Sequence, residues 1–217
     1  MSYYDDICSR ERFAADIKTH EMTILRDDGV YRHLRFKRPD SSTYYFDLIT
    51  WPGHLAMTGD MGANLFSRTN DMFEFFRTDR MHGSCDINPG YWAEKIQTDD
   101  RDAHKEWVVE KFNSIITNLL NEYLADCDLD EDDQKELREK VSDELLDPDD
   151  EHQAVERLRE WRDDNFDIDL CDFPNDKQFT YHYIWRCRAI AWAIKAYDTH
   201  KDEQAAAEIG KAMPCTS

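Results

Sequence analysis

The chain has 217 residues, of which 41% are hydrophobic and 12% aromatic. That length and composition can bury a sizeable core and exclude a disordered acidic tail. It carries 47 Asp and Glu against 27 Lys and Arg, a formal net charge of −20. This charge opposes binding to nucleic-acid phosphates and to anionic membranes, and its natural complement is a basic protein surface. No apolar run approaches the roughly 18 residues of a membrane-spanning helix.

The N-terminal part predicts a small antiparallel sheet. Ser9 is expected to cap a short helix over residues 10–19. Further on, Asp28-Gly29 and Pro52-Gly53 are strong hairpin signals because Gly tolerates positive φ. They separate β-branched, aromatic and apolar runs at residues 22–26, 30–38, 43–51 and 55–58. We therefore expect three or four strands.

Beyond the sheet the pattern becomes helical. Thr69 or Asn70 is expected to cap a short aromatic helix, and a stripe at helical spacing predicts a long helix over 103–124. Asp130 and Asp149 are expected to begin two further helices. Other helical segments are predicted at residues 91–97 and 179–197.

The predicted fold class is therefore α+β, with a small N-terminal antiparallel sheet followed by a mainly helical C-terminal part. We expect residues 1–90 to form the sheet with its flanking helices. Residues 91–209 form an acidic helical region that can also pack with the first part as one domain. Residues 210–217 are expected to be a disordered tail.

Catalytic and metal-binding motifs give little support for an enzyme. His82 and Cys85 place an imidazole near a thiol, but nothing in the sequence fixes their geometry, and a plain loop explains them as well. The six cysteines are widely spaced and are expected to stay as thiols. We predict no catalytic residue, no metal site and no cofactor.

The acidic repeats do not complete a calcium loop. Asp126, Asp128 and Asp130 alternate as in the first half of such a loop. Its sixth and twelfth positions then require Gly and Glu, where this chain has Glu131 and Leu137. The pair Asp167 and Asp169 has the same defect.

The dominant feature is the acidic stretch over residues 121–176. It holds 23 Asp and Glu against 6 Lys and Arg, a net charge of −17, so the other 161 residues carry only −3. One interpretation is a solvated helical surface with no binding role. The pairs Glu131–Lys135 and Glu136–Lys140 favour it, because they have the stabilising i,i+4 order.

The other interpretation is a surface that imitates nucleic acid. Carboxylates one helical turn apart stand roughly 6 Å apart, which approximates a track of phosphates. Glu156 and Glu160 form a like-charge i,i+4 pair, which costs stability and which solvation does not require. The candidate partner-binding residues are Asp130, Asp133, Glu136, Glu139, Asp143, Asp147, Asp149, Asp150, Glu156, Glu160, Asp163, Asp164 and Asp167.

A basic cluster lies in the predicted first hairpin. It consists of Arg26, Arg32, Arg35, Lys37 and Arg38. These side chains could face the acidic helices within the molecule or within a dimer. They could also touch nucleic acid, although the total charge opposes that.

Three segments resemble an uncharacterised family of small acidic accessory proteins of tailed bacteriophages and prophages. They are residues 45–62 (YFDLITWPGHLAMTGDMG), 88–95 (NPGYWAEK) and 183–198 (YIWRCRAIAWAIKAYD). The resemblance spans much of the chain and brings no assigned activity. It implies a phage setting, in which accessory proteins often inhibit host defence and acidic inhibitors often occupy a nucleic-acid groove.

These observations lead to one main hypothesis and two alternatives. The main hypothesis is a non-enzymatic inhibitor, cytoplasmic in the host cell, that binds a basic nucleic-acid-binding complex of the anti-CRISPR or anti-restriction target type. It would contact neither nucleic acid nor membrane directly. The first alternative is a structural or adaptor protein, as a homodimer, whose acidity only solvates it. The second is an enzyme acting through acidic residues or Cys85.

Overall fold

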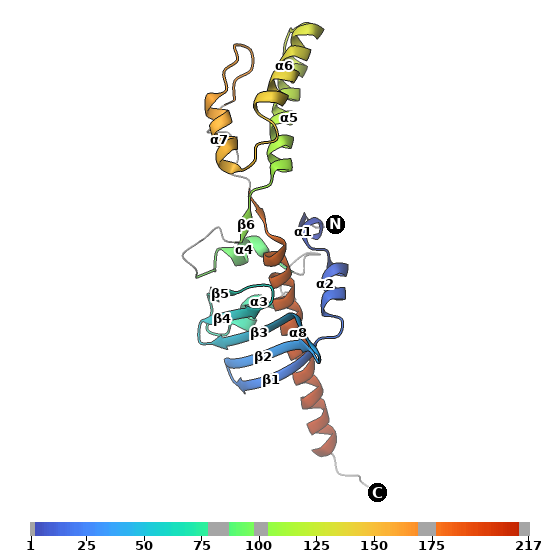
Figure 1. Ribbon diagram of the computed structural model, residues 1–217. Helices are drawn as coiled ribbons and strands as arrows, with labels where there is room; N and C mark the ends of the chain where they lie inside the picture. The colour runs from blue at the N-terminus through green and yellow to red at the C-terminus, as the bar shows by residue number, and fades with distance from the viewer. Residues whose placement is uncertain (1–2, 78–86, 98–103, 169–176, 213–217) are drawn as a thin grey trace. The chain divides into compact units, whose positions relative to one another are not determined.

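The protein is described here from a computed structural model (Figure 1) that covers residues 3–77, 87–97, 104–168 and 177–212. It divides into two compact units. Unit 1 comprises Met1–His104 and Phe179–Ser217, and unit 2 comprises Lys105–Gln178. Among the described helices, none combines the length and apolar character needed to cross a membrane.

Unit 1 contains a five-stranded antiparallel sheet, which confirms the α+β fold class. Its strands pair in sequence order, and the hairpin turns at Gly29 and Gly53 have positive φ angles of 59° and 81°. The fifth strand was not predicted because its four residues are too few to show an alternating pattern. The strands are β1 (Glu21–Asp28), β2 (Tyr31–Arg38), β3 (Ser41–Trp51), β4 (His54–Gly59) and β5 (Asn64–Ser67).

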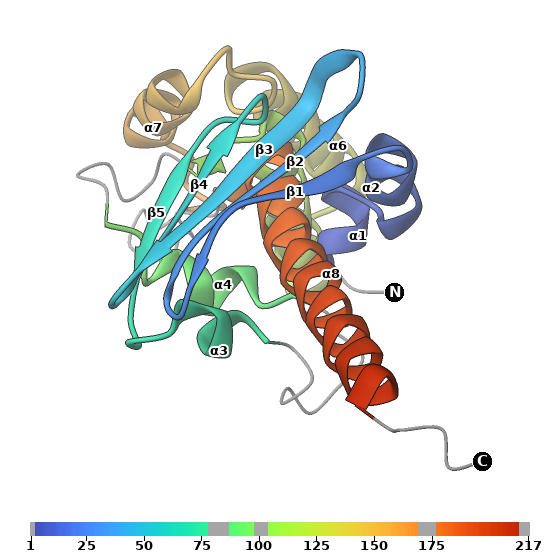
Figure 2. The same ribbon diagram turned by 90° about the horizontal axis from the view of Figure 1, so that it is seen from below.

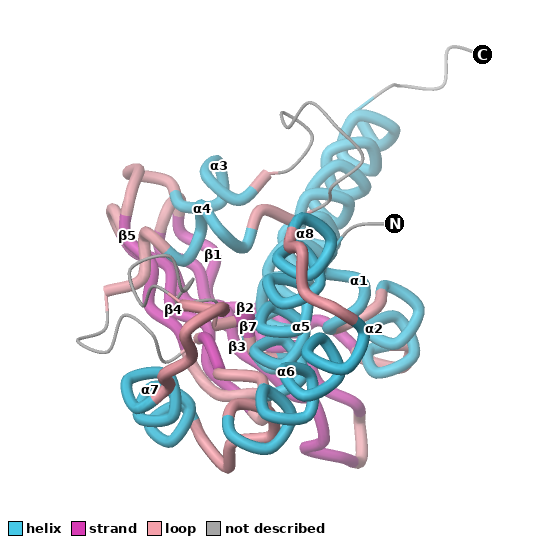
Figure 3. The backbone as a smooth tube through the Cα atoms, turned by 90° about the horizontal axis from the view of Figure 1, so that it is seen from above, coloured by secondary structure: helices cyan, strands magenta, loops and turns pink. Residues whose placement is uncertain are grey.

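One long helix, α8 (Tyr181–Ala212), covers one face of this sheet (Figure 2). Phe36 and Phe46 point from the sheet into the core, and the Phe36 ring lies 5.2 Å from the ring of Trp192 on α8. Figure 3 shows the strands gathered beside this helix. The described residues of unit 1 also form four shorter helices: α1 (Tyr3–Ile7), α2 (Arg10–Ile17), α3 (Met72–Phe76) and α4 (Pro89–Ala93).

The division into units differs from the boundary predicted at residue 90. The sequence places the last helix with the acidic region, whereas its buried side chains belong to the core of the sheet. The reason is composition: Tyr183, Trp185 and Ile190 are fully buried and need an apolar partner, which the inner face of the sheet supplies.

In the described part of unit 2, three helices and the segments that follow the second and the third of them form a separate core. The helices are α5 (Val109–Asp126), α6 (Glu131–Glu144) and α7 (Glu151–Glu160). A two-stranded sheet of β6 (Lys105–Glu106) and β7 (Gln178–Phe179) lies where the chain passes between the units. The core side chains are Phe112, Ile116, Leu120, Leu124, Leu137, Val141, Leu145, Ala154, Leu158, Trp161, Phe166 and Ile168.

Several helix boundaries differ from those predicted. Asp71, not Thr69 or Asn70, caps α3, because its carboxylate accepts the Phe73 N–H at 2.9 Å. Asp150 rather than Asp149 caps α7. The predicted 103–124 helix begins six residues later, and α8 continues to Ala212, into the segment predicted as a tail. Residues 213–217 lie outside the described residues.

Candidate partner-binding surface

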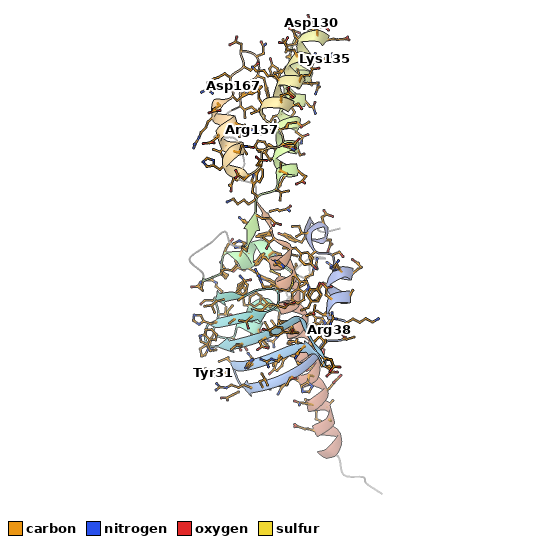
Figure 4. All side chains as sticks on the ribbon, in the orientation of Figure 1. Tyr31, Arg38, Asp130, Lys135, Arg157 and Asp167 are labelled. Carbon is orange, nitrogen blue, oxygen red and sulfur yellow. The ribbon has the colours of Figure 1, made fainter. Side chains whose placement is uncertain are left out.

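The helices of unit 2 turn their apolar sides inward and their acids outward. On α6, Leu137 and Val141 are buried, whereas Glu136 and Glu139 are exposed. An apolar stripe at helical spacing leaves the rest of the helix to solvent, so the positions of the acids follow from those of the core residues. Figure 4 labels Asp130 at the start of α6 and Asp167 in the segment after α7.

The structure exposes twelve of the thirteen candidate acids. The exception is Asp163, which is half-buried and accepts hydrogen bonds from Lys140 Nζ at 2.8 Å and from the Asn165 N–H at 2.9 Å. Burial alone would raise its pKa, but these hydrogen bonds outweigh burial and hold the pKa below its usual value. Asp163 therefore has a structural role in unit 2.

Two other candidates cap helices, and a third makes a contact with a distant side chain. Asp130 accepts the Asp133 N–H at 2.9 Å, and Asp150 accepts the Gln153 N–H at 2.8 Å, so each caps a helix. Asp147 has a positive φ of 53° and accepts a hydrogen bond from Asn113 Nδ2. These three carboxylates have structural roles as well as being exposed.

The bases of unit 2 neutralise few of its acids. Arg138 donates to Asn121 Oδ1 at 2.8 Å, and Arg157 donates to the Leu146 carbonyl at 2.5 Å, so both arginines bind uncharged acceptors. Unit 2 as a whole has 25 Asp and Glu against 9 Lys and Arg, which leaves a net charge of −16. Candidate carboxylates that make no hydrogen bond or ion pair with any described residue include Glu136, Asp143, Glu160, Asp164 and Asp167.

The two predicted i,i+4 pairs are not formed. Lys135 lies 3.8 Å from Glu139 rather than pairing with Glu131, and Lys140 pairs with Asp163 at 2.8 Å rather than with Glu136. Asp163 lies beside Lys140 in the folded unit, so the amino group of Lys140 pairs with Asp163 and not with Glu136. Glu136 is thereby left without the partner that the solvation interpretation gave it.

The basic hairpin is different, because its arginines are occupied within unit 1. The ion pairs are Arg26–Asp28 at 3.2 Å, Arg32–Asp71 at 2.9 Å and Arg35–Asp47 at 2.8 Å, and Arg38 donates to the Asp16 carbonyl at 3.0 Å. Arg32 is buried beneath the sheet rather than displayed on it. The unbalanced charge of the protein therefore lies on unit 2.

Unit 1 also has a surface cavity of about 590 Å³ beside α8. Its arginines already have carboxylate partners: Arg188 and Arg10 contact Asp5 at 2.7 and 3.8 Å, and Arg77 binds Asp198 at 2.9 Å. The cavity therefore shows no unsatisfied arginine. Its lining consists of Arg10, Phe13, Phe76, Arg77, Arg188, Ala191, Trp192, Ile194, Lys195, Asp198, Thr199 and Asp202.

The described part of the structure adds no support for the catalytic and metal-binding candidates. His82 and Cys85 lie outside the described residues. In the described part of the chain, no group of three or more His, Cys, Asp or Glu side chains is arranged to hold a metal ion, and this includes Asp126, Asp128 and Asp130. Burial raises the pKa of the Cys187 thiol to about 12, which makes it a poor nucleophile at neutral pH.

Comparison of the chain with protein-family models, with curated proteins and with solved structures finds no match in any of the three. The functional assignment therefore depends on the residues and on their geometry.

Proposed function

We propose that the protein is a non-enzymatic, phage-encoded inhibitor of a host nucleic-acid-binding defence complex. Its acidic surface, defined as the twelve exposed candidate carboxylates (those named above without Asp163), occupies the basic groove of a target such as a CRISPR effector or a restriction enzyme. The observation that carries this proposal is the contrast between the units. Unit 2 exposes unneutralised carboxylates, whereas most of the hairpin arginines of unit 1 are bound by carboxylates of their own unit.

The helices supply a spacing that suits this role. Glu136, Glu139 and Asp143 follow one another at intervals of three and four residues on α6, so neighbours stand roughly 6 Å apart. Phosphates along one DNA strand rise about 3.4 Å each. A row of Lys and Arg that contacts alternate phosphates therefore meets carboxylates at a similar repeat.

The helices that carry the acidic surface are held in fixed positions. The twelve-residue core of unit 2 fixes α6 and α7, so their carboxylates are ordered before a partner arrives. A pre-ordered surface loses less conformational entropy on binding than a flexible acidic tail does. Because the contacts are between opposite charges, the association is expected to be fast and strongly salt-dependent.

The resemblance to phage accessory proteins supports the setting of this proposal. Such proteins act inside the host cell, where defence complexes with basic nucleic-acid grooves are available as targets. The resemblance names no target, so the partner is identified here only by its chemistry.

The test is a pull-down from host lysate with two variants. The first variant carries Glu136→Lys, Glu139→Lys, Asp143→Lys and Glu156→Lys. The control carries the same charge change on exposed acids of unit 1: Glu11→Lys, Asp40→Lys, Glu203→Lys and Glu208→Lys. Wild type and control should retain one nucleic-acid-binding complex, and the first variant should lose it while keeping its circular-dichroism spectrum.

Elution with a salt gradient, with and without added DNA, tests mimicry directly. A mimic should be displaced steeply by salt and by competing DNA, because DNA and the acidic surface need the same groove. A partner that ignores both, or that binds the first variant as well as wild type, would show that the acidic surface only solvates the protein.

A further inference from the structure

Arg186 lies in the second turn of α8, and only 7% of its surface is exposed. Its Nη1 donates to the Met61 carbonyl at 2.6 Å, and its guanidinium carbon lies 6.0 Å from the ring centre of Tyr183. Its Nε is buried and has no hydrogen-bond acceptor among the residues that the structure describes. A guanidinium has five N–H donors, and the hydrogen bond to the Met61 carbonyl uses only one of them.

Arg186 differs from the other buried arginines of unit 1 in its ionic contacts. No carboxylate of the described residues lies within 4.0 Å of it. The other arginines buried in unit 1 are paired: Arg32 with Asp71 at 2.9 Å, and Arg188 with Asp5 at 2.7 Å. Burial lowers the pKa of Arg186, yet arginine stays protonated in proteins, so the cation cannot escape the cost of burial by neutralising itself.

The loop between β4 and β5 is shaped around this cation. At Gly62, a Cβ atom would lie 2.7 Å from Arg186 Nη1, and the residue has a positive φ of 88°. The Gly62 N–H bonds to the Gly59 carbonyl at 3.0 Å, which fixes the turn. Asn64, the first residue of β5, has a buried Oδ1 that accepts no hydrogen bond from the described residues. The loop therefore approaches the guanidinium closely.

A purely structural role accounts for part of this arrangement. Arg186 could serve only to hold the Met61 carbonyl, because a buried carbonyl needs a donor. A neutral donor would do that at lower cost, since a buried charge without a partner is among the most destabilising groups a core can contain. The contact with the Met61 carbonyl therefore does not explain why the buried donor at position 186 is a charged one.

We propose that Arg186 binds an oxyanion, a phosphate or carboxylate group, through the Nε–Nη2 edge that the Met61 contact leaves unused. This edge presents two parallel N–H donors, the geometry that guanidinium uses to bind phosphate and carboxylate. The anion supplies the missing counter-charge. The site belongs to unit 1 and does not depend on the acidic surface of unit 2.

Thermal unfolding of the full chain tests the proposal, with sodium phosphate, sodium acetate and AMP as probes and sodium chloride as the control at equal ionic strength. Saturating oxyanion should raise Tm above the chloride control, by roughly 5–10 °C at a hundred times Kd. A site for free phosphate responds at least as strongly to phosphate as to AMP. A site for a phosphorylated ligand responds more strongly to AMP.

Arg186→Met should abolish the oxyanion-dependent rise, and without oxyanion it should unfold no earlier than wild type. Arg68→Met, the same substitution at an exposed position of unit 1, should keep the full response. Calorimetric titration of phosphate and AMP into wild type gives an answer even if Arg186→Met fails to fold. No heat and no oxyanion-specific rise in wild type, or an unchanged rise in Arg186→Met, would overturn the proposal.

Discussion

At the scale of single residues, Asp71 links strand β2 to helix α3. Its carboxylate accepts two hydrogen bonds from Arg32, both at 2.9 Å, and the Phe73 N–H at the start of α3. Only 9% of the Arg32 side chain is exposed, so removing the charge of Asp71 leaves a buried cation. We expect Asp71→Asn to lower the free energy of unfolding by roughly 3 kcal/mol, measured by urea denaturation at pH 7.

The pH dependence of the same variant identifies the cause. Burial raises the pKa of Asp71, but the hydrogen bonds from Arg32 and Phe73 outweigh burial and hold it below its usual value. The stabilisation is therefore complete above the unfolded pKa of about 3.9 and is lost as the pH falls through the folded pKa. The difference between wild type and Asp71→Asn should shrink below about pH 4. A difference that stays constant down to pH 2 would assign the loss to packing instead.

At the scale of helices, replacing an acid that caps a helix should lower stability, whereas replacing an exposed acid that caps nothing should not. Asp130→Ala and Asp150→Ala each remove the acceptor of a first-turn N–H and should destabilise unit 2 by about 1 kcal/mol. Glu136→Ala and Glu160→Ala remove exposed charge from a crowded acidic surface and should leave stability unchanged or slightly higher. Thermal unfolding of the four single variants gives the comparison. Equal losses in all four would contradict this division of roles.

The same distinction shows what the sequence could predict at this scale. The hairpins at Gly29 and Gly53, and the start of α6 at Asp130, were predictable because each depends on neighbouring residues. The pairing of Lys140 with Asp163 was not, since the partners are 23 residues apart and only the folded unit brings them together. The binding role proposed for Arg186 could not be predicted for a related reason. Arg186 lies in an apolar stretch of the sequence, and only the folded structure shows that no described carboxylate lies near it. The exposure of the acidic residues followed directly from the positions of the core residues.

Across the whole molecule, charge is divided unequally, with −16 on unit 2 and −4 on unit 1. Like charges on one compact unit repel each other, and salt screens that repulsion. Raising the ionic strength from about 0.01 M to 0.15 M shortens the Debye length from about 30 Å to 8 Å. We therefore expect salt to slow amide hydrogen exchange in α6 and α7 much more than in β2 and β3.

Hydrogen exchange measured by mass spectrometry assigns the effect to each segment of the chain. The four-Lys variant of α6 and α7 should lose most of the salt effect in unit 2, because it reduces the repulsion without adding salt. The control with four reversals in unit 1 should keep the effect. An equal response of α6 and β2 to salt would mean that the acids of unit 2 do not repel one another appreciably. In that case a basic partner would gain little from neutralising them, and the case for the acidic surface as a binding site would weaken with it.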